Sequence, residues 1–235
     1  MKIKRIKFAF TLSEVLITLS IIGIIAAITL TGILHKYKKT EMETRLKKTY
    51  SVLSQALLMS VAKDGYLITD DFTDANDEEM KEWFEYYMKP YLKIEKVCYN
   101  ETGCWHEGKT KTLNNNYASL AKESVGIGTN IFVFILNTGI TVNGDVWSKN
   151  DTYNYFGVKS DNKSLVLYID INGIKFPNTI GKDIFIFVFA ENGLVPAGND
   201  MTREEIDENC SASGNGYYCA AKIMLNSWQF SDENL

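Results

Sequence analysis

Glu14 is the single ionisable residue in a long apolar stretch near the start of the chain. Residues 15–34 carry no charge, and about twenty residues at ~1.5 Å each span a bilayer core of ~30 Å. An ionised carboxylate in such a place is costly unless a positive group pairs with it. No lysine or arginine occupies position 17, 18, 21 or 22, so helical neighbours supply no counter-ion. Glu14 therefore either lies among lipid head groups or pairs with a cation of another molecule.

Four cysteines form two local pairs along the sequence, Cys98 with Cys104 and Cys210 with Cys219. Four cysteines allow three connectivities, which the sequence alone does not distinguish. We expect the local pairs because each brackets a short loop; free buried thiols are the alternative. A zinc site is disfavoured, because neither pair has the usual ligand spacing and His106 is the only nearby imidazole. Disulfides would place these residues in an oxidising compartment outside the cytoplasm.

A segment between residues 168 and 185 suits either cation binding or turn formation. Asp170, Asn172 and Asp183 offer hard oxygen ligands of the kind that calcium prefers. The segment departs from an EF-hand, since Ile174 stands where a third oxygen ligand would be. Asp, Asn and Gly also satisfy backbone groups in turns, and Asn172 with the glycine after it is a favoured hairpin dipeptide. We therefore expect a hairpin turn here rather than a calcium site, and no cofactor elsewhere.

Signals for catalysis are missing from the sequence. It has two histidines, His35 and His106, and none of the GxSxG, HExxH or P-loop motifs. An isolated GxG at residues 126–128 fits a turn. We therefore expect that the chain is not an enzyme. The formal net charge is −4, and removing the basic residues at the start would make the remainder more acidic, which argues against nucleic-acid contact.

A single long helix is expected to carry Glu14. The apolar run is longer than the ~7–15 residues of a cleavable secretory signal, so we expect a membrane-spanning helix. Cationic residues flank both ends of the run in nearly equal number, so the positive-inside rule does not decide the orientation of the helix. The cysteines, if they form disulfides, place the C-terminal domain outside the cytoplasm. No Pro or Gly occurs from 33 to 64, which favours one helix from about 10 to 62 over a break and a second helix. Its second half carries one apolar stripe at spacings of three and four, made of Leu46, Tyr50, Leu53, Leu57 and Val61.

The rest of the chain predicts an α+β head. Asp77-Glu78-Glu79 opens a short helix, and Thr202 with Glu205 matches a capping box that opens another. We expect residues 143–164 to be loop and residues 220–228 to be a short helix or strand. Asn-Gly and Asn-Thr-Gly turns between the β-prone runs predict an antiparallel meander with one face covered by the helix stripe. The runs are Ile131–Leu136, Ile140–Val142, Leu165–Ile171, Ile184–Ala190 and Leu194–Val195.

The N-terminal segment AFTLSEVLITLSIIGIIAAITL, preceded by four cationic residues, resembles the processing segment of type IV prepilins and type II secretion pseudopilins. The resemblance implies that a prepilin peptidase cuts between Ala9 and Phe10, followed by Thr11 and Leu12, and that Phe10 is then N-methylated. It also implies that Glu14 is the filament-assembly residue. One departure is Ala9, where the family usually has glycine; alanine is also small, so we expect processing to survive.

The resemblance implies a domain order and a location. Residues 1–9 would be a removed leader, 10–34 a transmembrane and filament-core helix, 35–63 its amphipathic continuation, and 64–235 an extracytoplasmic head. The chain would sit in the inner membrane and then enter a periplasmic or extracellular filament. Its partners would be other pilin or pseudopilin subunits, the prepilin peptidase, the assembly platform and, before assembly, the lipid bilayer.

The implied function is structural: a subunit of a type IV pilus or a type II secretion pseudopilus. Two alternatives stay open. One is a minor, priming or tip subunit of the same kind of filament. The other is a single-pass, membrane-anchored binding or adhesive protein that never polymerises.

Overall fold

The computed structural model describes residues 11–64, 77–118, 121–122, 126–127, 131–190 and 193–230. The chain divides into two compact units, residues 1–41 and residues 42–235. One helix, α1 (Leu12–Asp64), contributes to both units without interruption, as the absence of Pro and Gly after residue 32 predicts. The prediction of a single helix, rather than two with a break between them, is confirmed.

The first part of α1, residues 12–34, consists mostly of apolar residues and has no charged residue after Glu14. Within the described residues it is the one helix long and apolar enough to cross a membrane. Its hydroxyl side chains donate to backbone carbonyls three or four residues earlier, as Thr18 and Ser20 do to Glu14 and Leu16 at 2.9 and 2.8 Å. Such bonds satisfy a hydroxyl group that has no water available. This part of α1 therefore has a surface compatible with hydrocarbon.

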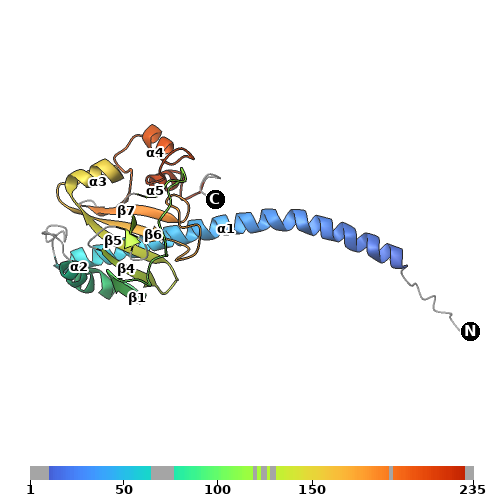
Figure 1. Ribbon diagram of the computed structural model, residues 1–235, viewed down its shortest axis with the longest axis horizontal. Helices are drawn as coiled ribbons and strands as arrows, with labels where there is room; N and C mark the ends of the chain where they lie inside the picture. Colours follow the sequence, from blue (N-terminus) through green and yellow to red (C-terminus); the bar gives the residue numbers. More distant parts are fainter. Residues whose placement is uncertain are drawn as a thin grey trace, which may run out of the picture. The chain divides into compact units, whose positions relative to one another are not determined.

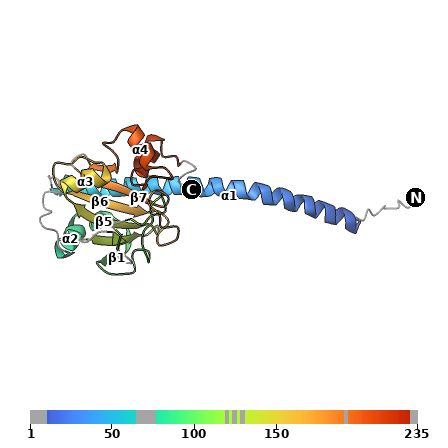
Figure 2. The same cartoon turned by 45° about the horizontal axis from the view of Figure 1, so that its top comes forward.

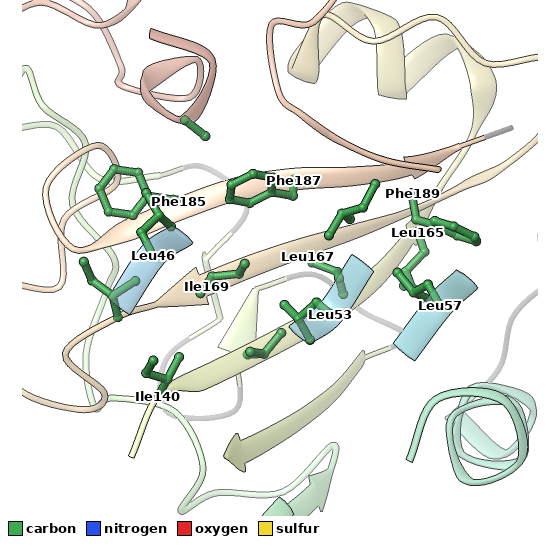
Figure 3. Packing of buried hydrophobic residues seen from close by; sticks show 14 of the residues in the cluster. Leu46, Leu53, Leu57, Ile140, Leu165, Leu167, Ile169, Phe185, Phe187 and Phe189 are labelled. Atoms are coloured by element: carbon green, nitrogen blue, oxygen red, sulfur yellow. The ribbon is translucent and has the colours of Figure 1, made fainter. Parts of the chain in front are cut away.

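The second part of α1 packs on the sheet of the head through its predicted stripe. Leu46, Leu53 and Leu57 are fully buried and point at side chains of the central strands (Figure 3). The Tyr50 hydroxyl donates to the Leu194 carbonyl at 3.0 Å, and its ring lies 5.3 Å from that of Phe187. The predicted amphipathic continuation of the helix is thus part of the hydrophobic core of the head.

Six antiparallel strands form the sheet, in the order β1-β4-β5-β6-β7-β8. The strands β1, β5, β6 and β7 are labelled in both views (Figure 1, Figure 2). Every neighbouring pair is antiparallel, and β4 and β5 are joined by the predicted turn at Asn137-Thr138-Gly139. The strands are β1 (Ile94–Tyr99), β4 (Ile131–Leu136), β5 (Thr141–Trp147), β6 (Ser164–Asp170), β7 (Ile184–Ala190) and β8 (Gly193–Pro196). A separate pair of short strands, β2 (Ala121–Lys122) and β3 (Gly126–Ile127), adds a second small sheet.

Both faces of the sheet are buried, whereas the sequence predicts a covering for one. The face toward α1 carries Phe185, Phe187 and Phe189, and the opposite face carries Ile186 and Val188. Strands buried on both faces read as continuous apolar runs rather than alternating ones, which is the pattern of β6 and β7. The opposite face is covered by residues of the segments around 104–118, 156–158 and 217.

Short helices complete the head. They are α2 (Asp77–Trp83), a π-helical turn (Phe84–Met88), a 3₁₀ turn (Lys89–Tyr91), α3 (Lys149–Phe156), α4 (Arg203–Asn209) and α5 (Cys219–Leu225). The predicted capping box at Thr202 and Glu205 is present at the start of α4. The prediction of loop for residues 143–164 is wrong, because β5 runs on to Trp147 and α3 follows it. The predicted antiparallel pairing of β6 with β7 is confirmed, but the prediction of a tight hairpin turn at Asn172 is wrong, because residues 171–183 separate the two strands.

Candidate functional site

Glu14 forms a capping box with Thr11 at the start of α1. The backbone N–H and the hydroxyl of Thr11 both donate to Oε2 of Glu14 at 2.8 Å, and the Glu14 N–H donates to the Thr11 hydroxyl at 3.2 Å. These contacts give Glu14 hydrogen-bond partners at the start of its own helix. A search for a lysine or arginine one turn away does not reveal them. Both donors are uncharged, so they orient the carboxylate, and none of the donors to it among the described residues carries a positive charge.

A sequence signal for this capping box exists. Thr11-x-x-Glu14 has the same spacing as Thr202-x-x-Glu205, the pair from which the start of α4 is predicted. The capping box also fixes where the helix begins, since Thr11 is the residue before Leu12, the first residue of α1. The predicted cleavage site at Ala9 and Phe10 lies outside the described residues.

Two glycines in the first part of α1 leave open space on its surface. A Cβ atom added at Gly23 or Gly32 would meet no heavy atom within 4 Å. Small residues on a membrane helix let the backbone of another helix approach closely. The surface of α1 at these positions is therefore accessible to another helix.

Both predicted local disulfides are present in the head. Cys98 in β1 is bonded to Cys104, with their Cα atoms 5.9 Å apart. Cys210, which follows α4, is bonded to Cys219, the first residue of α5, with a Cα separation of 4.9 Å. All four cysteines are buried and none is free, so the alternatives of free thiols and a zinc site do not describe this structure.

The connection between β6 and β7 is built around the carboxylate of Asp183. This buried carboxylate accepts the backbone N–H groups of Asn178 at 2.8 Å and Thr179 at 2.6 Å. The side-chain amide of Asn172 donates to the same carboxylate at 2.9 Å. Burial raises the pKa of Asp183, and these donors oppose the rise by favouring the charged form. The side chains therefore perform the turn chemistry that the sequence predicts, although in a longer connection than a hairpin.

Among the cavities lined by described residues of the head are a larger and a smaller one, and the residues named here as lining them form no recognisable catalytic set. The larger, about 770 Å³, is lined by residues of α3 and the loop after it, among them Lys149, Tyr153 and Lys159. The smaller, about 390 Å³, lies beside the Cys98–Cys104 loop and is lined in part by Trp105 and His106. Burial lowers the pKa of His106. Within the described ranges, no three His, Cys, Asp or Glu side chains gather as metal ligands would.

Comparison with known proteins gives two matches that together cover almost the whole chain. Residues 4–30 match the prokaryotic N-terminal methylation motif. Residues 32–233 match a family of unknown function, DUF6613. The chain belongs to DUF6613. Searches of the curated proteins and of the solved structures found no match to it.

The methylation motif marks this DUF6613 chain as a type IV pilin-like or pseudopilin-type protein. It covers the segment on which the resemblance to prepilins rests, from the cationic leader to most of the apolar run. Together with the long apolar helix, the motif supports membrane anchoring of the DUF6613 chain through its N-terminus. Proteins with this motif interact in general with a prepilin peptidase and with other pilin subunits.

Proposed function

We propose that this chain is a structural subunit of a type IV pilus or a type II secretion pseudopilus. The observation that carries the proposal is a methylation motif on an apolar helix whose first turn holds one carboxylate, to which the described residues offer uncharged donors. A prepilin peptidase would cut between Ala9 and Phe10, and Phe10 would be N-methylated. The function is structural, and no catalytic step is assigned to the head.

The proposed cut creates a positively charged group with which Glu14 would pair. A new α-amino group at Phe10 is positively charged near neutral pH. Glu14 of a neighbouring subunit would pair with that amine and so fix the axial register of packed helices. A misregistered subunit would leave a carboxylate unpaired in an apolar environment, which is strongly unfavourable.

Packing of helices in the filament would replace lipid around the first part of α1. Its apolar side chains are exposed in the isolated chain, and Gly23 and Gly32 leave room for a neighbouring helix. The two disulfides support an extracytoplasmic location for the head, because such bonds persist outside the reducing cytoplasm. Residues 1–9, 10–34, 35–63 and 64–235 would serve as leader, filament core, amphipathic connection and surface domain.

Labelled electron microscopy of the source cells tests this proposal. Antibody raised against the head is expected to decorate fibres attached to the cell, in a pattern lost when the gene is deleted. Label along the whole fibre would identify a major subunit, and label confined to tips would identify a minor or priming one. Label spread over the cell membrane with no fibre decorated would refute a filament subunit and favour a non-polymerising anchored protein.

A further inference from the structure

The connection between β6 and β7 carries an exposed apolar tip, residues 174–177. Ile174 is 60% exposed, and Phe176 is 86% exposed, which is more than any large apolar side chain in the first part of α1. Lys175 between them and Pro177 after them are exposed as well. A single exposed apolar side chain is ordinary, but an exposed aromatic ring beside a second apolar side chain on one loop suggests an interaction surface.

A set of hydrogen bonds at the base of the connection holds the tip in a defined conformation. The side-chain amide of Asn172 donates to the Phe176 carbonyl oxygen at 3.3 Å and to the Asp183 carboxylate at 2.9 Å. The Asp183 carboxylate also accepts the backbone N–H groups of the two residues that follow Pro177. The polar groups at the base are thus bonded to one another, while Ile174 and Phe176 remain exposed.

The tip lies at the end of the sheet where the head portion of α1 begins. Leu46 is the first fully buried residue of α1, and along the strands it lies toward Ile169 and Phe185 (Figure 3). β6 ends just after Ile169, and β7 begins just before Phe185. The connection between these two strands therefore leaves the sheet at that same end.

Direct contacts support this placement of the tip. The Arg45 guanidinium donates to the Thr138 carbonyl oxygen at 3.2 Å, in the turn between β4 and β5. A Cβ atom added at Gly173 would lie 2.6 Å from the carbonyl oxygen of Gly139 in the same turn, so the turn and the connection are in contact. Contacts therefore run from Arg45 of α1, through this turn, to the residue that precedes Ile174.

The apolar run of α1 ends a short way along the chain from Arg45. Eleven residues lead from Leu34 to Arg45, which is ~17 Å of helix. Lys36, Tyr37 and Lys38 lie in this interval and are exposed, and these residue types are typical of the membrane surface. Head groups occupy ~5–8 Å beyond the hydrocarbon on each side of a bilayer. The chain between the apolar run and Arg45 is thus short enough for a loop beside Arg45 to reach them.

We propose that Ile174 and Phe176 insert into the lipid interface while the unassembled chain is anchored in the membrane. Two apolar side chains around a lysine suit this surface, because the apolar groups enter the boundary of the acyl chains and the ammonium group stays among the phosphates. The inference rests on the membrane anchoring that the proposed function requires. It adds a second membrane contact, made by the head, to the one made by α1.

A carboxylate near the tip determines the expected lipid preference. The cavity of about 390 Å³ is lined by Glu107 together with Ile174 and Phe176. The negative charge of Glu107 offsets the positive charge of Lys175, so attraction to anionic lipids would contribute little. We therefore expect insertion to depend on apolar contact and to occur in a bilayer of neutral phosphatidylcholine.

Depth-sensitive spin labelling of the full chain in phosphatidylcholine nanodiscs tests this contact. All four native cysteines form disulfides, so a single added cysteine can be labelled. Lys175→Cys places a nitroxide between the two apolar side chains and leaves both in place. The matched control is Asp161→Cys, at a side chain 91% exposed that precedes β6 at the opposite end of that strand. For insertion of ~5–10 Å, collisions of the Lys175→Cys label with a water-soluble nickel chelate should be at least about fivefold rarer than those of the control, and its collisions with oxygen more frequent.

A change of the apolar side chains tests whether they cause the insertion. Ile174→Ser combined with Phe176→Ser alters two exposed positions and should leave the head folded. In that background the Lys175→Cys label should become as accessible to nickel as the Asp161→Cys label. Shielding of Lys175→Cys that persists in this background would overturn the inference.

A third label separates failure of this inference from failure of the proposed function. Ile25→Cys, in the apolar run, reports the membrane span itself. If Ile25→Cys is shielded from nickel but Lys175→Cys is as accessible as the control, the inference is overturned and the anchor stands. Loss of both nickel and oxygen collisions at Lys175→Cys would show protein around the tip and would also overturn it. An Ile25→Cys label open to nickel would refute the span on which the inference and the proposed function both rest.

Discussion

Replacing Glu14 by alanine is expected to leave N-terminal processing intact and to remove the chain from filaments. The proposed cut lies before Phe10, whereas the proposed role of Glu14 begins only when its charge meets the α-amino group of a neighbour. Removing one partner of a desolvated ion pair costs ~3–5 kcal/mol, which corresponds to roughly a hundredfold or greater loss in association. The quantity to measure is the chain recovered in a sheared-fibre fraction relative to the processed chain in the membrane.

Glu14 has two roles that matched variants can separate. It accepts hydrogen bonds from Thr11 in the capping box, and it carries the charge proposed to pair with the amine. Glu14→Gln retains an acceptor for Thr11 but no charge, and we expect it to fail in assembly as Glu14→Ala does. Thr11→Ala removes the capping hydroxyl and keeps the charge, so it should assemble. Assembly of Glu14→Gln at the wild-type level would show that the charge is not the assembly determinant.

Replacing Gly144 by alanine is expected to destabilise the head by about 3 kcal/mol. Gly144 in β5 pairs with Phe132 in β4, and an added Cβ would lie 2.2 and 2.5 Å from two ring carbons of Phe132. The ring is fully buried, and its centroid is 4.4 Å from that of Phe84 and 6.0 Å from that of Trp83. Since neighbouring rings restrict the Phe132 side chain, relieving this contact requires a shift of that ring with its neighbours or of the strands. Thermal unfolding should occur roughly 6–12 °C lower.

A second substitution shows whether the ring is the cause. Phe132→Leu removes the ring atoms that lie closest to the added Cβ. In that background, Gly144→Ala should cost less than about 1 kcal/mol further, so the two changes would be strongly non-additive. If Gly144→Ala lowered the free energy of unfolding equally in the wild type and in Phe132→Leu, Gly144 would be required for a reason other than the Phe132 ring.

Elements with a strong local signal follow from the sequence. The long apolar run and the stripe that includes Leu53 predict α1, and the unbroken apolar runs predict β6 and β7. In each case the element buries many apolar side chains, and these side chains follow one another or recur at a regular spacing in the sequence. The strand β1 is missed because it lies at the sheet edge, where Glu95 and Lys96 interrupt the apolar pattern.

Some elements are indicated by the residues at their ends and not by a pattern of hydrophobic residues. Helix α3 is polar, yet Ser148 caps its first turn by accepting the Asp151 N–H, and Gly157 ends it in the left-handed region with φ of 61°. These terminal residues define the helix better than its interior does. The partners of Asp183 could not be predicted from the sequence, because they depend on how residues 171–183 fold back on themselves.

The N-terminal peptide of the chain in a purified sheared-fibre fraction tests the central claim most directly. Mass spectrometry of that fraction should find a peptide that begins at Phe10 and carries an N-methyl group. A peptide beginning at Met1 in the same fraction, or the absence of the chain from fibres that its cells produce, would contradict the account of a processed filament subunit.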